Sequence, residues 1–353
     1  MTVPANSRAT SRASAVLPLA VGPAMMTTGC KSVTVSAPSI NIPWKNPEPA
    51  NLPAPASPNV LTLIAPTAGA LTGAIVAPAM AALNGLGAEV DDADWLAPEE
   101  ACDVPFAGVA ADAAETALRR VLVGLPVDIC VGPVDGRRKR LLVADMDSTM
   151  VAAETLDELA AAAGKRRKIA AITARAMAGD IEFADALRQR VAMLGGVSEG
   201  ALADTLAHVR LTAGAETLVR TMAAAGAYTV LVSGGCRYFT ERIARRLGFD
   251  AERGNLFETV AGRLTGRVGE PILDKHAKRR TLVETAQSHG IPIEGTLAVG
   301  DGANDVPMIE AAGLGVAYRA KPVLANAARA RIEHGDLTAV LFLQGYRRDE
   351  FAA

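Results

Sequence analysis

The chain has 353 residues, of which 50% are hydrophobic, and this is enough for two domains with a sizeable buried core. Lysine and arginine number 36 against 38 acidic residues, and the net charge of −2 argues against nucleic-acid or membrane-surface partners, which need a basic face. The four cysteines lie far apart without a C-x-x-C pair, which is typical of reduced thiols and favours a cytoplasmic location.

Residues 1–58 are rich in Ala, Ser, Thr and Pro and lack a sustained hydrophobic period, so a disordered tail is predicted. A lipoprotein signal is the alternative, because Arg8 and Arg12 precede an apolar stretch that ends in TTGC at Cys30. Two prolines interrupt that stretch, and Thr27 stands where such signals prefer leucine, so a plain tail or a start codon assigned too far upstream is favoured. No continuous apolar stretch reaches the ~18–20 residues that a membrane-spanning helix needs.

Residues 59–135 are predicted to form a small α+β domain. Apolar runs at 60–65, 88–97, 101–109 and 126–132 are typical of strands, and segments 70–87 and 112–124 are typical of helices. The order βαββαβ resembles the ACT-type regulatory fold, in topology alone. This resemblance implies a site for an amino acid such as serine, or a homodimer contact, or plain packing, and all three alternatives stay open.

From residue 136 to residue 353 the pattern is that of an α/β domain. Its first turn, GRRKR, is predicted to be solvated rather than phosphate-binding. The apolar runs 140–145, 228–233, 296–301 and 313–318 are each followed by a helix-length segment, which indicates a Rossmann-like parallel sheet covered on both faces. Residues from about 154 to 210 have only helical patterns. This all-helical cap is expected to cover the carboxyl ends of the strands, where open parallel sheets bind ligands.

Polar residues follow three of the predicted strands: Asp145 and Asp147, then Ser233, then Asp301, Asn304 and Asp305. Because the carboxyl ends of parallel strands meet at one edge of a sheet, these carboxylates are expected to gather there. Crowded carboxylates repel one another and need a cation, and oxygen ligands with open positions suit Mg²⁺. A serine and a lysine beside that ion would suit a phosphoryl group.

The motifs D-x-D-S-T (145–149), S-G-G (233–235), a lysine, and G-D-G-x-N-D (300–305) occur in this order. This arrangement resembles the haloacid dehalogenase superfamily of phosphatases, and over residues 140–340 it is similar to the phosphoserine phosphatase family within that superfamily. The resemblance implies Mg²⁺-dependent hydrolysis of O-phospho-L-serine to L-serine and phosphate through an aspartyl phosphate, as the last step of serine biosynthesis.

The resemblance also implies the catalytic and metal-binding residues. Asp145 would be the nucleophile, and Asp147 would protonate the leaving alkoxide and later take a proton from water. Mg²⁺ would be held by Asp145, by the backbone carbonyl of Asp147 and by Asp301. Asp305 would support this shell.

The phosphate would be bound by Ser233, by the amide of Gly234 and by a lysine. Two lysines lie near the start of a predicted helix in ILDKHAKRRTL, namely Lys275 and Lys278. The family pattern A-K-x-x-x-L corresponds to AKRRTL and selects Lys278, whereas Lys275 is expected to be solvated.

A phosphorylated amino acid carries an ammonium and a carboxylate, so its site needs one acid and one arginine. The resemblance implies Glu154 and Arg190 for these roles, Met177 and Phe183 as apolar walls, and Asn304 as a further contact. Arginine fits because its planar fork can bind a carboxylate through two hydrogen bonds.

Two departures from the family pattern are expected to be harmless, because Met146 should face the core and Cys236 should only pack. Two other functions remain open. A phosphatase of the same superfamily could act on phosphohomoserine, phosphothreonine or another small phosphomonoester. An amino-acid sensor with a vestigial phosphatase domain is less favoured, because the catalytic acids are intact.

Overall fold

The computed structural model describes residues 59–177 and 180–352, with the backbone alone for Met177. The predicted tail lies outside the described residues. In the part of the chain that the structure describes, no helix combines the length and apolarity that crossing a membrane requires.

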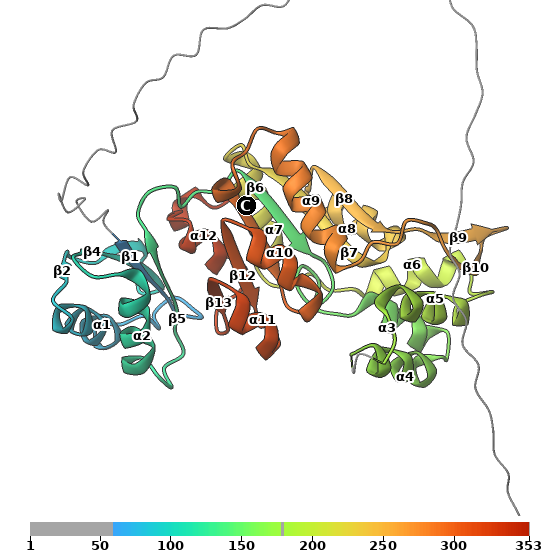
Figure 1. The fold of residues 1–353 in the computed structure, drawn as a ribbon, viewed down its shortest axis with the longest axis horizontal. Coiled ribbons are helices and arrows are strands. Elements are labelled where there is room, and N and C mark those ends of the chain that lie inside the picture. The colour runs from blue at the N-terminus through green and yellow to red at the C-terminus, as the bar shows by residue number, and fades with distance from the viewer. Residues whose placement is uncertain (1–58, 178–179, 353) are drawn as a thin grey trace, which may run out of the picture. The chain divides into compact units, whose positions relative to one another are not determined.

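The N-terminal unit is an antiparallel sheet with two helices on one face (Figure 1). Its elements are β1 (Asn59–Ile64), α1 (Gly73–Gly85), β2 (Glu89–Val90), β3 (Asp94–Ala97), β4 (Ala101–Ala107), α2 (Ala111–Val121) and β5 (Asp128–Pro133). The strand order is β2-β4-β1-β5, and β3 also pairs with β4. Apolar side chains of both helices pack with those of β1, β4 and β5 into one core cluster.

The single strand predicted for residues 88–97 is wrong, because this segment forms two short strands. Val90 lies opposite Phe106, whereas Asp94 lies opposite Asp103, so one extra residue is inserted between the two pairs. Such an insertion is a β-bulge, which interrupts the ladder. The acidic residues 91 and 92 fall in this interruption.

The other face of the N-terminal sheet contacts the α/β domain through charged groups. Arg137 donates to Asp103 at 2.5 Å and to the hydroxyl of Thr62 at 2.9 Å, and also to the carbonyl of Phe342 at 3.2 Å. The expectation of a solvated turn is therefore wrong for Arg137, whose side chain is only 14% exposed. Its charge is used to join the two parts of the chain rather than to face solvent.

The α/β domain is built on a six-stranded parallel sheet of order β13-β12-β11-β6-β7-β8. The strands are β6 (Leu141–Asp145), β7 (Tyr228–Cys236), β8 (Ala251–Asn255), β11 (Thr296–Gly300), β12 (Leu314–Tyr318) and β13 (Ala330–Ile332). The helices are α7 (Ala215–Ala224), α8 (Arg237–Leu247), α9 (Lys275–Ser288), α10 (Val306–Ala311), α11 (Pro322–Ala327) and α12 (Ala339–Leu343). The predicted Rossmann-like core is confirmed, with two additional edge strands.

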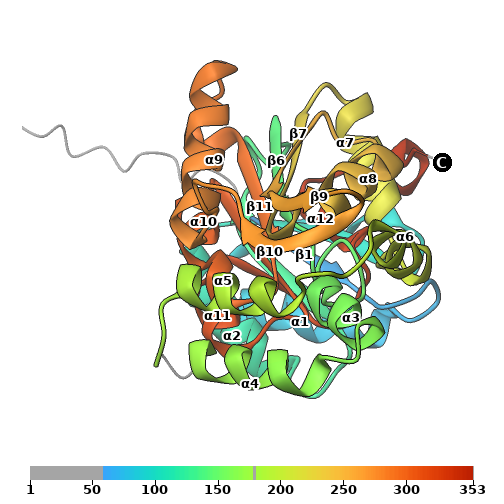
Figure 2. The same cartoon turned by 90° about the vertical axis from the view of Figure 1, so that its right-hand side faces the viewer.

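Helices cover both faces of this sheet, as the continuous apolar strands predict. Leu142 and Ala144 pack with side chains of α7, α8 and α12, whereas Leu141 and Val143 pack with side chains of α9 and α10. Figure 2 shows α9 and α10 on one side of β6, β7 and β11, and α7 and α8 on the other. Residues that alternate along β6 therefore serve two separate cores.

Of the five helices described between β6 and β7, α7 packs on the sheet and the first four form the cap: α3 (Thr155–Ala162), α4 (Arg166–Met177), α5 (Phe183–Met193) and α6 (Glu199–His208). The two connecting segments pair with each other, because Val151 and Leu211 form an antiparallel bridge and the amide of Ala152 donates to the carbonyl of Arg210 at 3.0 Å. Val151 also forms a parallel bridge with Asp147, so the base of the cap is tied to the segment that follows β6.

A hairpin of β9 (Phe257–Val260) and β10 (Arg263–Val268) lies beside the cap (Figure 1). Leu264 of this hairpin exchanges two backbone hydrogen bonds of 2.8 Å with the loop after α5, one with Gly196 and one with Val197. The hairpin therefore links the cap to the segment that leads into α9.

Candidate active site

The register of the parallel sheet brings the predicted polar residues to one edge. Asp145, the last residue of β6, lies opposite Val232 of β7, and Ala144 lies opposite Val299 of β11. Ser233 and Asp301 each come one or two residues further along their strands, so their side chains flank Asp145. The register thus brings the carboxylates of Asp145 and Asp301 together, with Ser233 at the end of the neighbouring strand.

A buried lysine lies between two of the aspartates. The Nζ of Lys278 is 2.5 Å from Oδ1 of Asp145 and 2.6 Å from Oδ1 of Asp305. Its direction is set by the start of α9, where the Asp274 side chain accepts the amide of Ala277 at 2.8 Å and caps the helix. Lys275, one turn earlier on this helix, is exposed, so the structure brings the predicted lysine and not its neighbour to the site.

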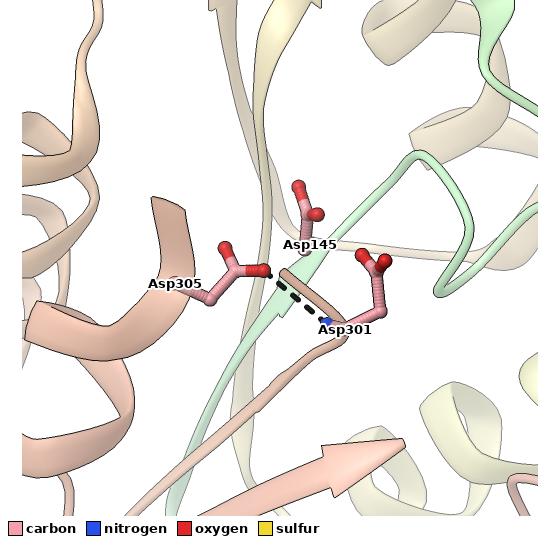
Figure 3. Close-up of side chains that lie close together, drawn as sticks. All are labelled: Asp145, Asp301 and Asp305. Carbon is pink, nitrogen blue, oxygen red and sulfur yellow. Dashed lines mark hydrogen bonds between the residues drawn. The ribbon is translucent and has the colours of Figure 1, made fainter. Parts of the chain in front are cut away.

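Three aspartates form a cluster with the geometry of a metal site. Asp145, Asp301 and Asp305 each offer an oxygen atom, and these atoms lie within 4.8 Å of one another (Figure 3). Asp305 accepts the amides of Asp301 at 3.3 Å and Gly302 at 3.2 Å, so it also holds the loop that carries Asp301. In Figure 3 the dashed line joins the Asp305 carboxylate to the backbone nitrogen of Asp301, and no such bond is drawn to the carboxylates of Asp145 and Asp301.

Negative charge exceeds positive charge in this buried cluster. Burial and the neighbouring Asp305 raise the pKa of Asp145, and the same two causes raise the pKa of Asp301 to about 6. Burial by itself lowers the pKa of Lys278, but Asp145 and Asp305 together hold it above the ordinary value. One lysine cannot neutralise three acids, and the remaining oxygen ligands are those that Mg²⁺ prefers, so the residues fit a divalent cation.

Saturating MgCl₂ is expected to raise the melting temperature more at about pH 7.5 than at about pH 5.5. The pKa of Asp301 in the folded protein, about 6, lies above its ordinary value of 3.8. Ionised Asp301 therefore destabilises the metal-free protein as the pH rises through this interval, and a bound cation removes that loss. Below about pH 6 protons compete with the metal.

Differential scanning fluorimetry with and without MgCl₂ at the two pH values measures this effect. The variant Asp301→Asn is the control and should lose most of the Mg²⁺-dependent rise at both pH values. An equal rise at both pH values in the unaltered protein would show that Asp301 does not control cation binding.

Asp147 is held by two donors. Its Oδ1 accepts the backbone amide of Thr155 at 2.8 Å, and its Oδ2 accepts the hydroxyl of Ser233 at 2.9 Å. The Ser233 oxygen in turn accepts the amide of Gly235 at 2.9 Å. In this state the hydroxyl predicted to bind phosphate is therefore bonded to the carboxyl predicted to move protons.

The residues predicted to bind the amino-acid part lie on the cap. Glu154 accepts the Ser148 hydroxyl at 2.9 Å, and burial together with Asp147 raises the pKa of Glu154. Burial lowers the pKa of Arg190, although the charges of Asp157 and Glu154 oppose this shift. Among the described residues, the one hydrogen bond of Arg190 runs from Nε to Ala186 at 3.4 Å, so most of its fork is unused.

Phe183, the first residue of α5, covers the end of β7. A Cβ atom on Gly234 would lie 2.9 Å from the Cζ atom of the Phe183 ring, so any larger residue would have to displace this ring. Ser233 and Lys278 are both 1% exposed, so both lie at the buried end of the site. Asn304 lies close by and donates to Asp305 at 3.4 Å, whereas the side chain of Met177 lies outside the described residues.

Sequence reasoning missed two residues. The amide of buried Asn255 donates to the carbonyl of Gly234 at 2.8 Å, and its carbonyl oxygen accepts the amide of Leu273 at 2.7 Å, so Asn255 ties the phosphate loop to the start of α9. Thr155 supplies the amide that holds Asp147. No local pattern distinguishes either residue, because the partners of Asn255 lie 21 and 18 residues away and the group that Thr155 donates is a backbone amide, which any residue but proline carries.

The two expected harmless departures agree with the structure. Met146 is fully buried in the core cluster. Cys236 is also buried, and burial raises the pKa of its thiol to about 11, so this sulfur is a poor nucleophile.

Comparison with known proteins agrees with this geometry. Residues 142–310 match a family model described as haloacid dehalogenase-like hydrolase. A phosphoserine phosphatase of Streptomyces coelicolor is 40% identical over 287 residues, which cover 80% of this chain and 70% of that protein. A probable phosphoserine phosphatase from Vibrio cholerae has a solved structure with a TM-score of 0.68 and 30% identity, covering 83% of this chain and 88% of that one. A phosphoserine phosphatase solved as a phospho-aspartyl intermediate analogue has a TM-score of 0.55 and 37% sequence identity. The match covers 58% of this chain and 98% of that one.

Proposed function

Because the chain belongs to the haloacid dehalogenase-like hydrolase family, and within it to the phosphoserine phosphatases, we propose that it hydrolyses O-phospho-L-serine to L-serine and phosphate. We assign it the last step of serine biosynthesis. The observation that carries the proposal is the buried contact of Lys278 with Asp145, beside a second acid, Asp147, that is bonded to Ser233. This arrangement supplies a nucleophile, a charge for the phosphate and a proton donor.

In the first step Asp145 attacks phosphorus, the Asp–phosphorus bond forms and the ester bond to the serine oxygen breaks. Asp147 gives its proton to the departing oxygen, so the leaving group departs as an alcohol. Lys278 offsets the negative charge of the phosphoryl oxygens. When bound by Asp145, Asp301 and the carbonyl of Asp147, Mg²⁺ supplies further positive charge at the reacting phosphoryl group.

In the second step water replaces Asp145 on phosphorus and phosphate leaves. Asp147, now ionised, takes the proton from that water and returns to its starting state. In this proposal the cap covers the bound substrate and limits the access of bulk water during the first step.

The cap selects the substrate in this proposal. Glu154 binds the ammonium group and Arg190 binds the carboxylate, with Phe183 as an apolar wall. Burial raises the pKa of Glu154 and lowers that of Arg190, although Glu154 is exposed and Arg190 is half-buried, so a bound substrate would complete the desolvation of this charge pair.

A panel of phosphomonoesters tests the substrate. With MgCl₂ present, kcat/KM is expected to be highest for O-phospho-L-serine and lower for phosphothreonine, phosphohomoserine and p-nitrophenyl phosphate. A higher value for one of the other amino-acid esters would move the assignment to that ester. The absence of phosphate release from every ester would instead support the sensor alternative. Running the panel with and without L-serine also measures whether this product changes the rate, either at the active site or at the N-terminal unit.

Arg190→Ala is expected to lower kcat/KM for phosphoserine by about 10²-fold, because the proposed charge-assisted contact with the substrate carboxylate is lost. The same variant should change kcat/KM for p-nitrophenyl phosphate, which has no carboxylate, by less than about threefold. Arg167→Ala is the matched control, because Arg167 lies on the cap helix α4 and is exposed. Equal losses with both substrates would contradict the recognition role.

We propose a cytoplasmic location for the enzyme. In the described part of the chain Cys102, Cys130 and Cys236 are all free thiols, as expected in a reducing compartment.

A further inference from the structure

Thr155 carries a buried hydroxyl that has no partner. It is the first residue of α3 and is fully buried, and its Oγ1 makes no hydrogen bond to any described residue. Leaving a buried hydroxyl unpaired costs about 1–3 kcal/mol, so such a group calls for an explanation. Its own backbone amide already binds Asp147, which places the hydroxyl beside the proposed proton donor.

The Ser233 hydroxyl has two tasks and only one proton. In the present structure it donates to Oδ2 of Asp147 at 2.9 Å. To bind a phosphoryl oxygen it must turn that proton away from Asp147. Oδ2 of Asp147 then loses its donor at the stage when the orientation of this carboxyl group controls proton transfer.

Three oxygen atoms share the space in front of Gly235. An ideal Cβ on this glycine would lie 3.0 Å from Oγ of Ser233, 3.1 Å from Oδ2 of Asp147 and 3.7 Å from Oγ1 of Thr155. No side chain separates these atoms, because residue 235 is glycine. Rotation of Thr155 between staggered χ1 positions can therefore redirect its hydroxyl within the same small space.

We propose that Thr155 is a positioning residue whose hydroxyl replaces Ser233 as the partner of Asp147 once Ser233 binds the phosphate. This inference rests on the proposed role of Asp147 as proton donor. As the ester bond breaks and the Asp145–phosphorus bond forms, the proton passes from Asp147 to the serine oxygen. The carboxylate left on Asp147 then accepts the O–H of Thr155.

The test compares Thr155→Val and Thr155→Ser with the unaltered enzyme. Both variants keep the backbone amide, and valine has the shape of threonine without its hydroxyl. For O-phospho-L-serine, whose leaving alkoxide needs a proton, Thr155→Val is expected to lower kcat/KM about tenfold. For p-nitrophenyl phosphate, whose leaving group needs none, the change should stay below about twofold. Thr155→Ser should restore phosphoserine turnover to within about twofold.

Product inhibition by L-serine separates positioning from substrate recognition. Thr155→Val should leave the inhibition constant unchanged, whereas Glu154→Gln, at a proposed recognition residue, should weaken it. Thr155→Val should not lower the melting temperature, because it removes a buried hydroxyl that has no partner in the described structure.

Equal losses with the two substrates, no loss with phosphoserine, or no rescue by serine would each overturn the role of Thr155 while leaving the proposed function intact. A failure of the proposed function appears elsewhere, in the unaltered enzyme, as the absence of phosphate release from phosphoserine. That result would overturn the inference together with the function.

Discussion

Replacement of Asp145 by asparagine is expected to lower kcat for O-phospho-L-serine by about 10⁴-fold, because the amide cannot attack phosphorus. No covalent phosphoenzyme should form. Acid quenching during turnover followed by mass spectrometry measures this directly, since an aspartyl phosphate adds one phosphoryl group to the peptide that contains residue 145. The unaltered enzyme should show that addition, and Asp145→Asn should not.

Asp147→Asn is the matched control, two residues away. It should lose turnover as well, because no base activates water, yet it should still become phosphorylated by p-nitrophenyl phosphate, whose leaving group needs no acid. Phosphorylation of Asp145→Asn, or its absence in both variants, would assign the nucleophile to another residue.

Loss of folding cannot explain this expected result. Burial and Asp305 raise the pKa of Asp145, so its charge is unfavourable in the metal-free protein. Lys278 keeps its contact with Asp305 in the variant, at 2.6 Å, and no cation is left unpaired. The melting temperature of metal-free Asp145→Asn should therefore equal or exceed that of the unaltered protein, as is common where a site is arranged for activity rather than stability.

The central strands of the sheet could be predicted because they are buried on both faces, which makes them continuously apolar. The edge strands could not. β8 has the sequence AERGN, with little apolar character, and β13 has only three residues, so neither has a pattern distinct from a loop. Both are strands because an existing neighbour offers unpaired backbone groups, and this is a long-range cause.

The site could be predicted to the extent that it follows from strand ends. Asp145, Ser233 and Asp301 meet because parallel strands end together, whatever side chains follow them. The N-cap at Asp274 and the position of Lys278 one turn later also have a local pattern. Asn255 and Thr155 could not be predicted, because their bonds join segments that only the folded chain brings together.

Arg137 illustrates the same limit. A run of basic residues next to a strand usually lies in solvent, and three of its four members give no local reason to think otherwise. The Arg137 side chain is only 14% exposed because it forms an ion pair with Asp103, which lies 34 residues earlier on the covered face of the N-terminal sheet. The identity of that partner follows from how the two parts of the chain meet.

Replacement of Lys278 by methionine is expected to lower kcat/KM for phosphoserine by about 10³-fold and to destabilise the metal-free protein by about 3–5 kcal/mol. The activity falls because the phosphoryl oxygens lose a positive charge. The stability falls because Asp145 and Asp305, both buried, would face each other without the ammonium group that lies 2.5 and 2.6 Å from them. Methionine keeps the length of the side chain, so the effect is one of charge rather than volume.

Lys275→Met is the matched control, since Lys275 lies one turn earlier on the same helix and is exposed. It should change the free energy of unfolding by less than about 0.5 kcal/mol. Urea unfolding of both variants without metal measures the difference. The double variant Lys278→Met with Asp305→Asn should regain part of the lost stability, because one of the two unpaired charges is gone.

The pH dependence gives the deciding measurement. Lys278 lowers the pKa of Asp145, so this pKa rises further without the lysine, and an acid whose pKa is higher in the folded state loses stability as the pH increases. The deficit of Lys278→Met should therefore be larger at about pH 7.5 than at about pH 5.5. A cation at the site would oppose the same repulsion, so saturating MgCl₂ should reduce the deficit. A deficit that is the same at both pH values and insensitive to MgCl₂ would show that Lys278 acts by packing alone and would remove the electrostatic basis of the site.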